Sequence, residues 1–418
     1  MQNQERLSVS KNALYNSVGT IFYCFCQWIT SALLVVHLSP EATSVSNTGL
    51  LQLAISVTNI FYSISLYSIP TYQISDIKNK YSNGDYIGTR FVTAAIAVLL
   101  CVLYVLILGY SAKSVLCIVF YMLYKLSETF CDVLHGIDQK NYRMDYGGIS
   151  YILRGVVMTV VFAAVLMITG DLLVSIVAMA ASTLAVVALY DVRCTSKFGS
   201  VKPIFNKKVI PSLLITCLPA VISTASFTAI TSIPRQMLEG MHGEEALGYY
   251  GTIATPLVVV QVMATSIFNP MLTELAEFYI DNKITDFVKR LFKNLMLLIL
   301  IAAFVCLCVA FLGEFAVGLV FGQKFVPYTY LMYGIIGCTT LYVVSWLCTN
   351  VLIIMRKLKV CMAASLISLA VSSLLARPFI NLFYMNGVSY SIIIAYIIHI
   401  SVCSVIIYRT LKIKGKES

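Results

Sequence analysis

Three ionisable residues, Lys125, Glu128 and Asp132, occur in an otherwise apolar stretch from Ser114 to Leu134. Their spacing of three and four residues places all three side chains on one face if the stretch is helical. The stretch is about long enough to cross a bilayer, where a central charge costs at least ~2.5–3.5 kcal/mol and usually faces a bundle interior or a water-filled cavity. The pattern therefore indicates a pathway for a solute or an ion.

Arg154 lies on the next apolar stretch and is expected to approach Glu128 or Asp132 from the cytoplasmic side. Two interpretations are open. In the first, Lys125 and Arg154 attract an anion while Glu128 or Asp132 binds H+ or Na+, or forms a gate. In the second, the charges neutralise one another and fix two helices together, because Lys125 and Glu128 can pair on the same helix.

Two further arginines stand beside prolines at the predicted outer ends of apolar stretches, as Pro234-Arg235 and Arg377-Pro378. A guanidinium group matches the oxygens of a phosphate group, so both are candidates to bind an anion. The alternative is that they reach the outer lipid headgroups and serve as anchors.

These residues must be positioned by membrane helices, because 59% of the 418 residues are hydrophobic and 11% are charged. Such a composition is typical of a polytopic membrane protein. The first apolar run, 13–38, is too long for the hydrophobic region of a cleavable signal peptide. Apolar stretches of about 20 residues predict twelve transmembrane helices. Their expected ranges are 13–38, 49–70, 88–110, 114–135, 149–169, 172–190, 209–233, 248–269, 291–312, 328–354, 359–377 and 386–408.

The lysines and arginines give this topology a direction. With twelve spans both termini lie on one side, and most of the 29 cationic residues, Arg90 among them, fall on that side. The positive-inside rule makes that side cytoplasmic. The exceptions are Lys113, Arg235, Lys324 and Arg377 on the outer side, with Lys125 and Arg154 within helices. The net charge of +10 therefore reflects topology, and we expect no nucleic-acid partner.

The chain divides into two halves of six helices. We expect an N-terminal lobe over 1–191, a basic cytoplasmic linker over 192–208 and a C-terminal lobe over 209–418. A weak internal repeat, in which Asp85 aligns with Asp286, favours two related lobes with a site between them, although it could be coincidental.

The sequence lacks the common motifs of nucleotide-binding and hydrolytic enzymes. It contains no Walker A loop, no H-E-x-x-H and no G-x-S-x-G, and its 13 cysteines show no metal-ligand spacing. We expect no enzymatic activity, no metal and no cofactor other than a coupling ion, H+ or Na+.

Several segments, in order, resemble the Wzx-type O-antigen and polysaccharide flippases of the multidrug/oligosaccharidyl-lipid/polysaccharide exporter superfamily. The most specific is KLSETFCDVLHGIDQKNYRMDYGGISYILRG, from Lys125 to Gly155, and SIPRQMLE at Arg235 is next. The others are GLLQLAISVTNIF, LGYYGTIATP and FGQKFVPY.

The resemblance implies two six-helix lobes around a central cavity that opens alternately to each side of the bacterial inner membrane. The implied substrate is an undecaprenyl-pyrophosphate-linked oligosaccharide, with membrane lipids, a polysaccharide polymerase and a chain-length regulator as partners. Arg154, Arg235, Lys125 and Arg377 become candidates to bind the anionic headgroup, and Glu128 and Asp132 become candidates for ion coupling. A cation-coupled exporter of small organic compounds and a membrane-embedded glycan polymerase are the alternatives.

Overall fold

A computed structural model describes residues 7–75 and 80–417 of the chain. All regular elements in these residues are helical, which confirms the predicted all-α fold. Contacts between residues divide the chain into two compact units, Met1–Val221 and Ile222–Ser418. The basic segment 192–208, expected to be a linker, belongs to the first unit, and its beginning extends the sixth transmembrane helix as far as Phe198.

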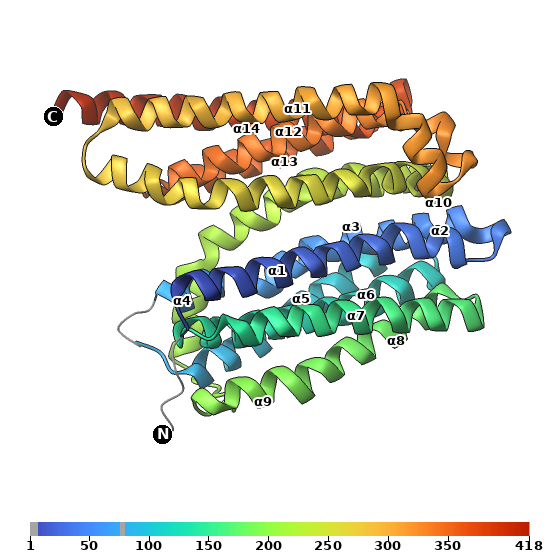
Figure 1. The fold of residues 1–418 in the computed structure, drawn as a ribbon, viewed down its shortest axis with the longest axis horizontal. Coiled ribbons are helices and arrows are strands. Elements are labelled where there is room, and N and C mark those ends of the chain that lie inside the picture. Colours follow the sequence, from blue (N-terminus) through green and yellow to red (C-terminus); the bar gives the residue numbers. More distant parts are fainter. Residues whose placement is uncertain (1–6, 76–79, 418) are drawn as a thin grey trace. The chain divides into compact units, whose positions relative to one another are not determined.

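In its described residues the first unit contains six long apolar helices and the short α4 (Ile69–Ser75). The ribbon of Figure 1 shows how they follow one another. A π-helical stretch, Ile29–Leu34, interrupts the first long helix, and another, Val187–Asp191, interrupts the sixth. The elements are α1 (Val9–Trp28) and α2 (Val35–Leu38), which form the first span, α3 (Ser44–Leu66), the short α4 (Ile69–Ser75), α5 (Asn83–Leu108), α6 (Ala112–Lys140), α7 (Met144–Thr169), and α8 (Leu172–Val186) with α9 (Val192–Thr195), which form the sixth span.

The helix α6 lies at the centre of the first unit, where it contacts α3, α5, α7 and α8. The apolar side chains Val133, Leu134 and Ile137 of α6 belong to a buried cluster that also includes Tyr86 of α5 and Val187 of the π-helical stretch. Lys125 and Glu128, on the polar face of α6, are also buried among these helices instead of facing lipid. This central position explains how a bilayer-spanning helix can carry three ionisable side chains.

A glycine pair brings α1 and α7 close together. A Cβ atom added to Gly19 of α1 would lie 2.5 Å from the carbonyl oxygen of Gly148 on α7. Small residues permit this kind of close backbone approach between membrane helices. The contact fixes the distance between the two helices that present side chains to the polar face of α6.

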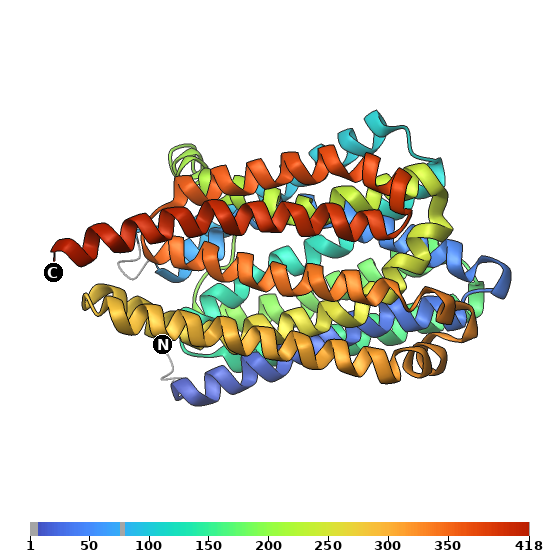
Figure 2. The ribbon, with the colours of Figure 1, turned by 90° about the horizontal axis from the view of Figure 1, so that it is seen from above.

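The second unit contains the rest of α10 (Val209–Ile280), then α11 (Ile284–Phe321), α12 (Leu331–Ile354), α13 (Leu358–Phe383) and α14 (Asn386–Glu417). Its core joins Leu275, Phe287, Val351 and Cys403 from four of these helices. The helices of this unit run roughly parallel or antiparallel to one another (Figure 2).

The helix α10 counts as two transmembrane helices. Its backbone breaks at Gly243, where φ is 82°, and the chain reverses direction within α10 (Figure 1). The described residues contain 11 helices long and apolar enough to cross a membrane, and the one that includes Gly243 spans 48 residues. The whole of α10 has 72 residues, so at 1.5 Å per residue its length is about 108 Å, enough for two crossings of a bilayer core of about 30 Å. The predicted set of about twelve spans is confirmed.

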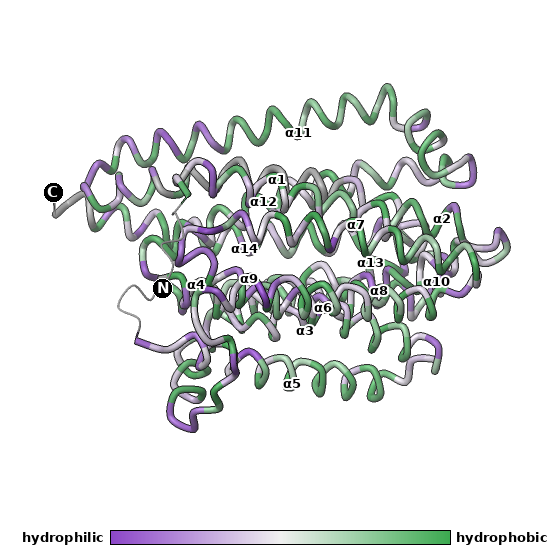
Figure 3. Tube along the Cα trace, turned by 60° about the horizontal axis from the view of Figure 1, so that its bottom comes forward, coloured by the Kyte–Doolittle hydropathy of each residue, from purple (hydrophilic) through white to green (hydrophobic). Residues whose placement is uncertain are grey.

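The outward faces of the helices are apolar. On α5 the side chains of Leu99, Leu106 and Ile107 are exposed, and on α11 those of Phe304 and Phe311 are exposed. Both helices are hydrophobic over most of their length (Figure 3). A protein in water would not expose such surfaces, so they are suited to contact lipid tails.

The aligned acidic residues of the internal repeat occupy equivalent places. Asp85 lies in the first turn of α5, where it forms a capping box with Ser82, and Asp286 lies in the first turn of α11. Both carboxylates stand where the helix dipole favours negative charge. Each of these helices is the third span of its predicted lobe.

Candidate functional site

Lys125 and Glu128 form a buried ion pair on α6. The Lys125 Nζ lies 2.9 Å from Glu128 Oε2, as their spacing on one helix allows. Two side chains from α1 and one from α6 donate further hydrogen bonds to Oε1 of this carboxylate: Tyr23, Gln27 and Tyr124. The Lys125 ammonium also lies 5.0 Å from the centre of the Tyr62 ring. Glu128 is thus saturated with donors, and the network ties α1 to α6.

Asp132 pairs with Arg90, not with Arg154. The Arg90 Nη2 lies 2.7 Å from Asp132 Oδ2, and its Nη1 donates to the carbonyl oxygens of Ser65 and Leu66 at 2.8 and 2.6 Å. Those carbonyls end α3, so the guanidinium also caps a helix C-terminus. Arg154 was expected to approach Glu128 or Asp132, but each of these carboxylates forms its ion pair with another cation. Arg90 was overlooked because it stands near the start of a span, where sequence alone classed it as a cytoplasmic cation.

Arg154 is buried without a matching anion. It is 1% exposed, and its guanidinium lies over the rings of Tyr23 and Tyr151, at 4.8 and 5.2 Å from their centres. Its Nε and Nη1 atoms have no hydrogen-bond partner. The carboxylates of Glu128, Asp132 and Asp191 act on it electrostatically from a distance. A buried donor without a partner is costly, so this geometry marks Arg154 as a binding group.

A polar cavity of about 200 Å³ opens beside the C-terminal half of α6, within the first unit. Asp132, His135, Asp138 and Gln139 of α6 line it together with Tyr151 of α7. Sites for drug-sized ligands are about 300–1,000 Å³, so this cavity suits ions and water and is too small for a glycan. Asp132 contributes a side chain that is 30% exposed, in contrast to the enclosed Glu128.

The loop that leads from α6 into α7 carries its own ion pair. The Arg143 Nε and Nη2 atoms lie 2.9 and 2.8 Å from the two carboxylate oxygens of Asp145. Because the hydrogen-bonded Asp145 stabilises the charged guanidinium, the pKa of Arg143 is raised above its ordinary value. This bidentate pair fixes the loop beside Met144, which lines the cavity.

The two predicted outer arginines have different surroundings in the second unit. Arg235 is half-buried, lies over the Tyr250 ring at 5.8 Å from its centre, and has an Nε atom without a partner. Tyr250 is in turn held by a 3.1 Å hydrogen bond to Ser389. Arg377 is exposed on α13. Within the described residues no contact joins the two arginines. Arg235, held over a tyrosine ring with an unpaired nitrogen, is a better candidate to bind an anion than the exposed Arg377.

The comparisons with known proteins start from the family match. Residues 9–276 match the family described as polysaccharide biosynthesis protein. The chain belongs to this family. The predicted membership of a polysaccharide-export family is thereby confirmed. The matched range includes the whole charged face of α6, Arg154 and Arg235, whereas Arg377 lies beyond it.

One relative in sequence and two solved structures are similar to this chain. The chain is 28% identical over 317 residues to the capsular polysaccharide biosynthesis protein CapF of Staphylococcus aureus, covering 75% of this chain and 78% of the relative. An inward-facing MATE family multidrug resistance transporter of the MOP superfamily matches with a TM-score of 0.69 at 11% identity, covering 100% and 98% of the two chains. The lipid II flippase MurJ, in an inward closed conformation, matches with a TM-score of 0.69 at 13% identity, covering 93% and 86%.

The polysaccharide biosynthesis family member thus has the fold of multi-pass membrane transporters. At these identities the structural likeness concerns the fold alone. The buried charges of α6 and the unpaired guanidinium nitrogens of Arg154 and Arg235 are properties of this chain itself. Sequence reasoning found Lys125, Glu128, Asp132 and Arg154, and missed Arg90, whose basic character in an apolar helix was the available signal.

Proposed function

We propose that this protein is a flippase that moves an undecaprenyl-pyrophosphate-linked oligosaccharide from the cytoplasmic to the outer leaflet by alternating access. It would supply repeat units for a surface polysaccharide such as O-antigen or capsule. The family match and the MATE and MurJ fold support the general class, a transporter acting in polysaccharide biosynthesis.

The observation that carries the proposal is the pair of arginines with unsatisfied donors. Arg154 in the first unit and Arg235 in the second each have a guanidinium that stacks on tyrosine and a buried nitrogen without a partner. A pyrophosphate group offers several oxygens to such donors, and charge-assisted hydrogen bonds of this kind are about twice as strong as neutral ones. Lys125 is a weaker candidate than either arginine because Glu128 already neutralises it.

Ion coupling is assigned to Asp132 in preference to Glu128. Asp132 lines the polar cavity and exposes part of its carboxylate, so H+ or Na+ can reach it. Binding of a cation there would compete with Arg90 for the same oxygen. Release of Arg90 would free the end of α3, which offers a physical link between ion binding and helix movement.

The proposal places the protein in the bacterial inner membrane with both termini in the cytoplasm. Its ligands there are the lipid-linked glycan and the surrounding lipids, and a polysaccharide polymerase and a chain-length regulator would act on the product. No nucleic acid is involved.

The second candidate is a cation-coupled exporter of small organic compounds, because a MATE family transporter matches the whole length of the chain. Such an exporter would need carboxylates that are free to bind an organic cation. Here Glu128 is paired with Lys125, and Asp132 is paired with Arg90. The charge pattern therefore favours an anionic substrate. A glycan polymerase is a weaker alternative without a supporting contact.

The decisive experiment deletes the gene and determines where lipid-linked repeat units accumulate. Single units held on the cytoplasmic leaflet, released by the wild-type gene and not by an Arg154→Met variant present at the same level, are the expected result. Unpolymerised units on the outer leaflet would assign the protein to polymerisation instead. Normal glycan export combined with altered resistance to organic cations would favour the small-compound exporter.

A further inference from the structure

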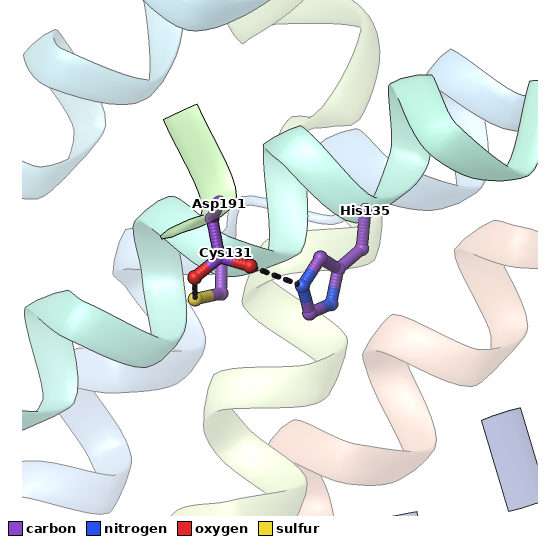
Figure 4. A group of neighbouring side chains, drawn as sticks. All are labelled: Cys131, His135 and Asp191. Atoms are coloured by element: carbon purple, nitrogen blue, oxygen red, sulfur yellow. Dashed lines mark hydrogen bonds and ion pairs between the residues drawn. The ribbon is translucent and has the colours of Figure 1, made fainter. Parts of the chain in front are cut away.

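Three side chains of metal-binding types meet beside α6 within two turns after Glu128. Cys131 and His135 are one turn apart on α6, and Asp191 approaches them from the end of the sixth span (Figure 4). The His135 Nε2 lies 3.0 Å from Asp191 Oδ1, and the Cys131 Sγ lies 3.3 Å from Asp191 Oδ2. One ligand atom from each residue falls within 4.8 Å of the other two.

The backbone around Asp191 is arranged for this approach. Asp191 ends the π-helical stretch Val187–Asp191, in which the helix widens before α9 resumes. Such π-helical turns are rare and often occur at functional sites. As a result the carboxylate, 2% exposed, points at α6. The π-helical turn is a second observation, independent of the residue types.

The donor set fits a zinc-class ion. A thiolate, an imidazole and a carboxylate are the three groups that bind Zn²⁺, at about 2.0–2.3 Å. Ligands at those distances around one tetrahedral ion lie roughly 3.3–3.8 Å apart, so the three side chains need only small adjustments. A soft sulfur ligand beside nitrogen and oxygen favours zinc, cobalt or a similar transition ion over Mg²⁺ or Ca²⁺.

The cavity beside α6 supplies access and a fourth position. His135 lines this cavity together with Asp138, which has a buried carboxylate oxygen without a partner. The His135 Nδ1 is also buried without a partner. Water from the cavity would complete the tetrahedron and could donate to Asp138, while Nδ1 would bond to a second water. Three protein ligands with one water is an established arrangement for zinc.

Charges near the group are compatible with two anionic ligands. Arg154 acts electrostatically on both Cys131 and Asp191, and its positive charge offsets the negative charge of a thiolate and a carboxylate. Asp132 and Asp138 are the other acidic groups on the same side of α6, and both line the cavity. They add attraction for a divalent cation at the entrance.

We propose that Cys131, His135 and Asp191 form a binding site for a zinc-class transition-metal ion that links α6 to the sixth span of the first unit. The site lies beside the residues assigned to transport, since His135 and Asp132 line the same cavity, but it uses none of those residues as a ligand. A bound ion would hold Asp191 and the π-helical turn against the helix that carries the transport residues. The inference departs from the sequence-based expectation of no metal, because Asp191 lies 56 residues from His135 and the ligand spacing cannot be recognised locally.

The test uses the purified full-length protein in detergent, treated with a chelator and then titrated with Co²⁺. We expect one Co²⁺ per chain, an absorption band from sulfur-to-cobalt charge transfer, displacement of the band by Zn²⁺, and a higher melting temperature with Zn²⁺. Cys131→Ser should abolish the charge-transfer band. His135→Gln and Asp191→Asn should each weaken binding at least about tenfold, since even loss of an outer-shell partner costs 10–100-fold.

The matched control is Cys101→Ser, which removes another buried cysteine of the first unit from α5. It should leave the band and the stoichiometry unchanged. Persistence of the band in Cys131→Ser, or Co²⁺ binding by wild type no tighter than by a Cys131→Ser/His135→Gln/Asp191→Asn variant, would overturn the proposal. Should Cys131→Ser not fold, the wild-type titration and the His135→Gln variant still decide the question. None of these measurements depends on glycan transport.

Discussion

Arg90→Met should mainly reduce stability and Arg154→Met should mainly reduce transport, although both arginines are almost completely buried. Arg90 is satisfied by Asp132 and by the carbonyl oxygens of Ser65 and Leu66. Removal of one partner from a buried ion pair costs about 3–5 kcal/mol. Asp132 is 30% exposed, so we expect the lower end of this range for Arg90→Met.

Arg154 forms no close ion pair with a carboxylate in the described residues, and the nearby acidic groups act on it only from a distance. Arg154→Met gives up two ring contacts, worth about 0.5–2 kcal/mol each. It also removes the cost of burying guanidinium donors without hydrogen bonds, which is about 1–3 kcal/mol. The two terms nearly cancel, and stability should change by about 1 kcal/mol or less. If Arg154 binds the headgroup, glycan export should nevertheless fall by about tenfold or more, because a charge-assisted hydrogen bond is worth about 1.5–3 kcal/mol.

The assay combines thermal unfolding of purified protein with glycan export in cells at matched protein levels. About 3 kcal/mol corresponds to a shift on the order of 10 °C for a unit of this size. Arg193→Ala, at an exposed arginine of the first unit, is the control and should change neither quantity. The reasoning fails if Arg154→Met unfolds as readily as Arg90→Met, because Arg154 would then be a structural residue. It also fails if Arg154→Met is stable and exports glycan normally.

Three further predictions concern Arg235, Asp132 and the contact between α1 and α7. Arg235→Ala should lower export, measured as surface glycan, about tenfold or more at normal protein level, whereas Arg377→Ala, at an exposed position, should have a smaller effect. Unchanged export in both variants would identify both arginines as lipid anchors. Asp132→Asn should alter the dependence of transport on H+ or Na+ in vesicles, whereas Glu128→Gln should mainly reduce stability. An unchanged ion dependence in Asp132→Asn would show that Asp132 does not take part in coupling. Gly19→Val should destabilise the α1–α7 contact by about 1–3 kcal/mol and reduce the yield of folded protein on size exclusion. Gly240→Val, at a position with open space around it, should reduce the yield less. Similar yields of the two variants would contradict the close-contact argument.

Local pattern in the sequence was enough for the membrane helices and for their polar face. Hydropathy and length identified the spans, because each helix must satisfy its own backbone hydrogen bonds and present apolar side chains to lipid. The spacing of Lys125, Glu128 and Asp132 predicted their common face, and Lys125 and Glu128 form their ion pair within a single helix turn. The ordered motifs also pointed to the family that the comparisons confirm. All of these features depend on residues that are close together in the chain.

Tertiary structure decided which charges meet. Asp132 takes Arg90, 42 residues away, and leaves Arg154 buried between tyrosine rings without an anion. The approach of Asp191 to Cys131 and His135 likewise depends on a π-helical turn that no spacing rule identifies. A helix's own sequence specifies which residues share a face, but not the rotation and depth at which that face meets its neighbours. Packing of the whole unit sets those two quantities, and they determine whether a buried charge is neutralised or left to bind a ligand.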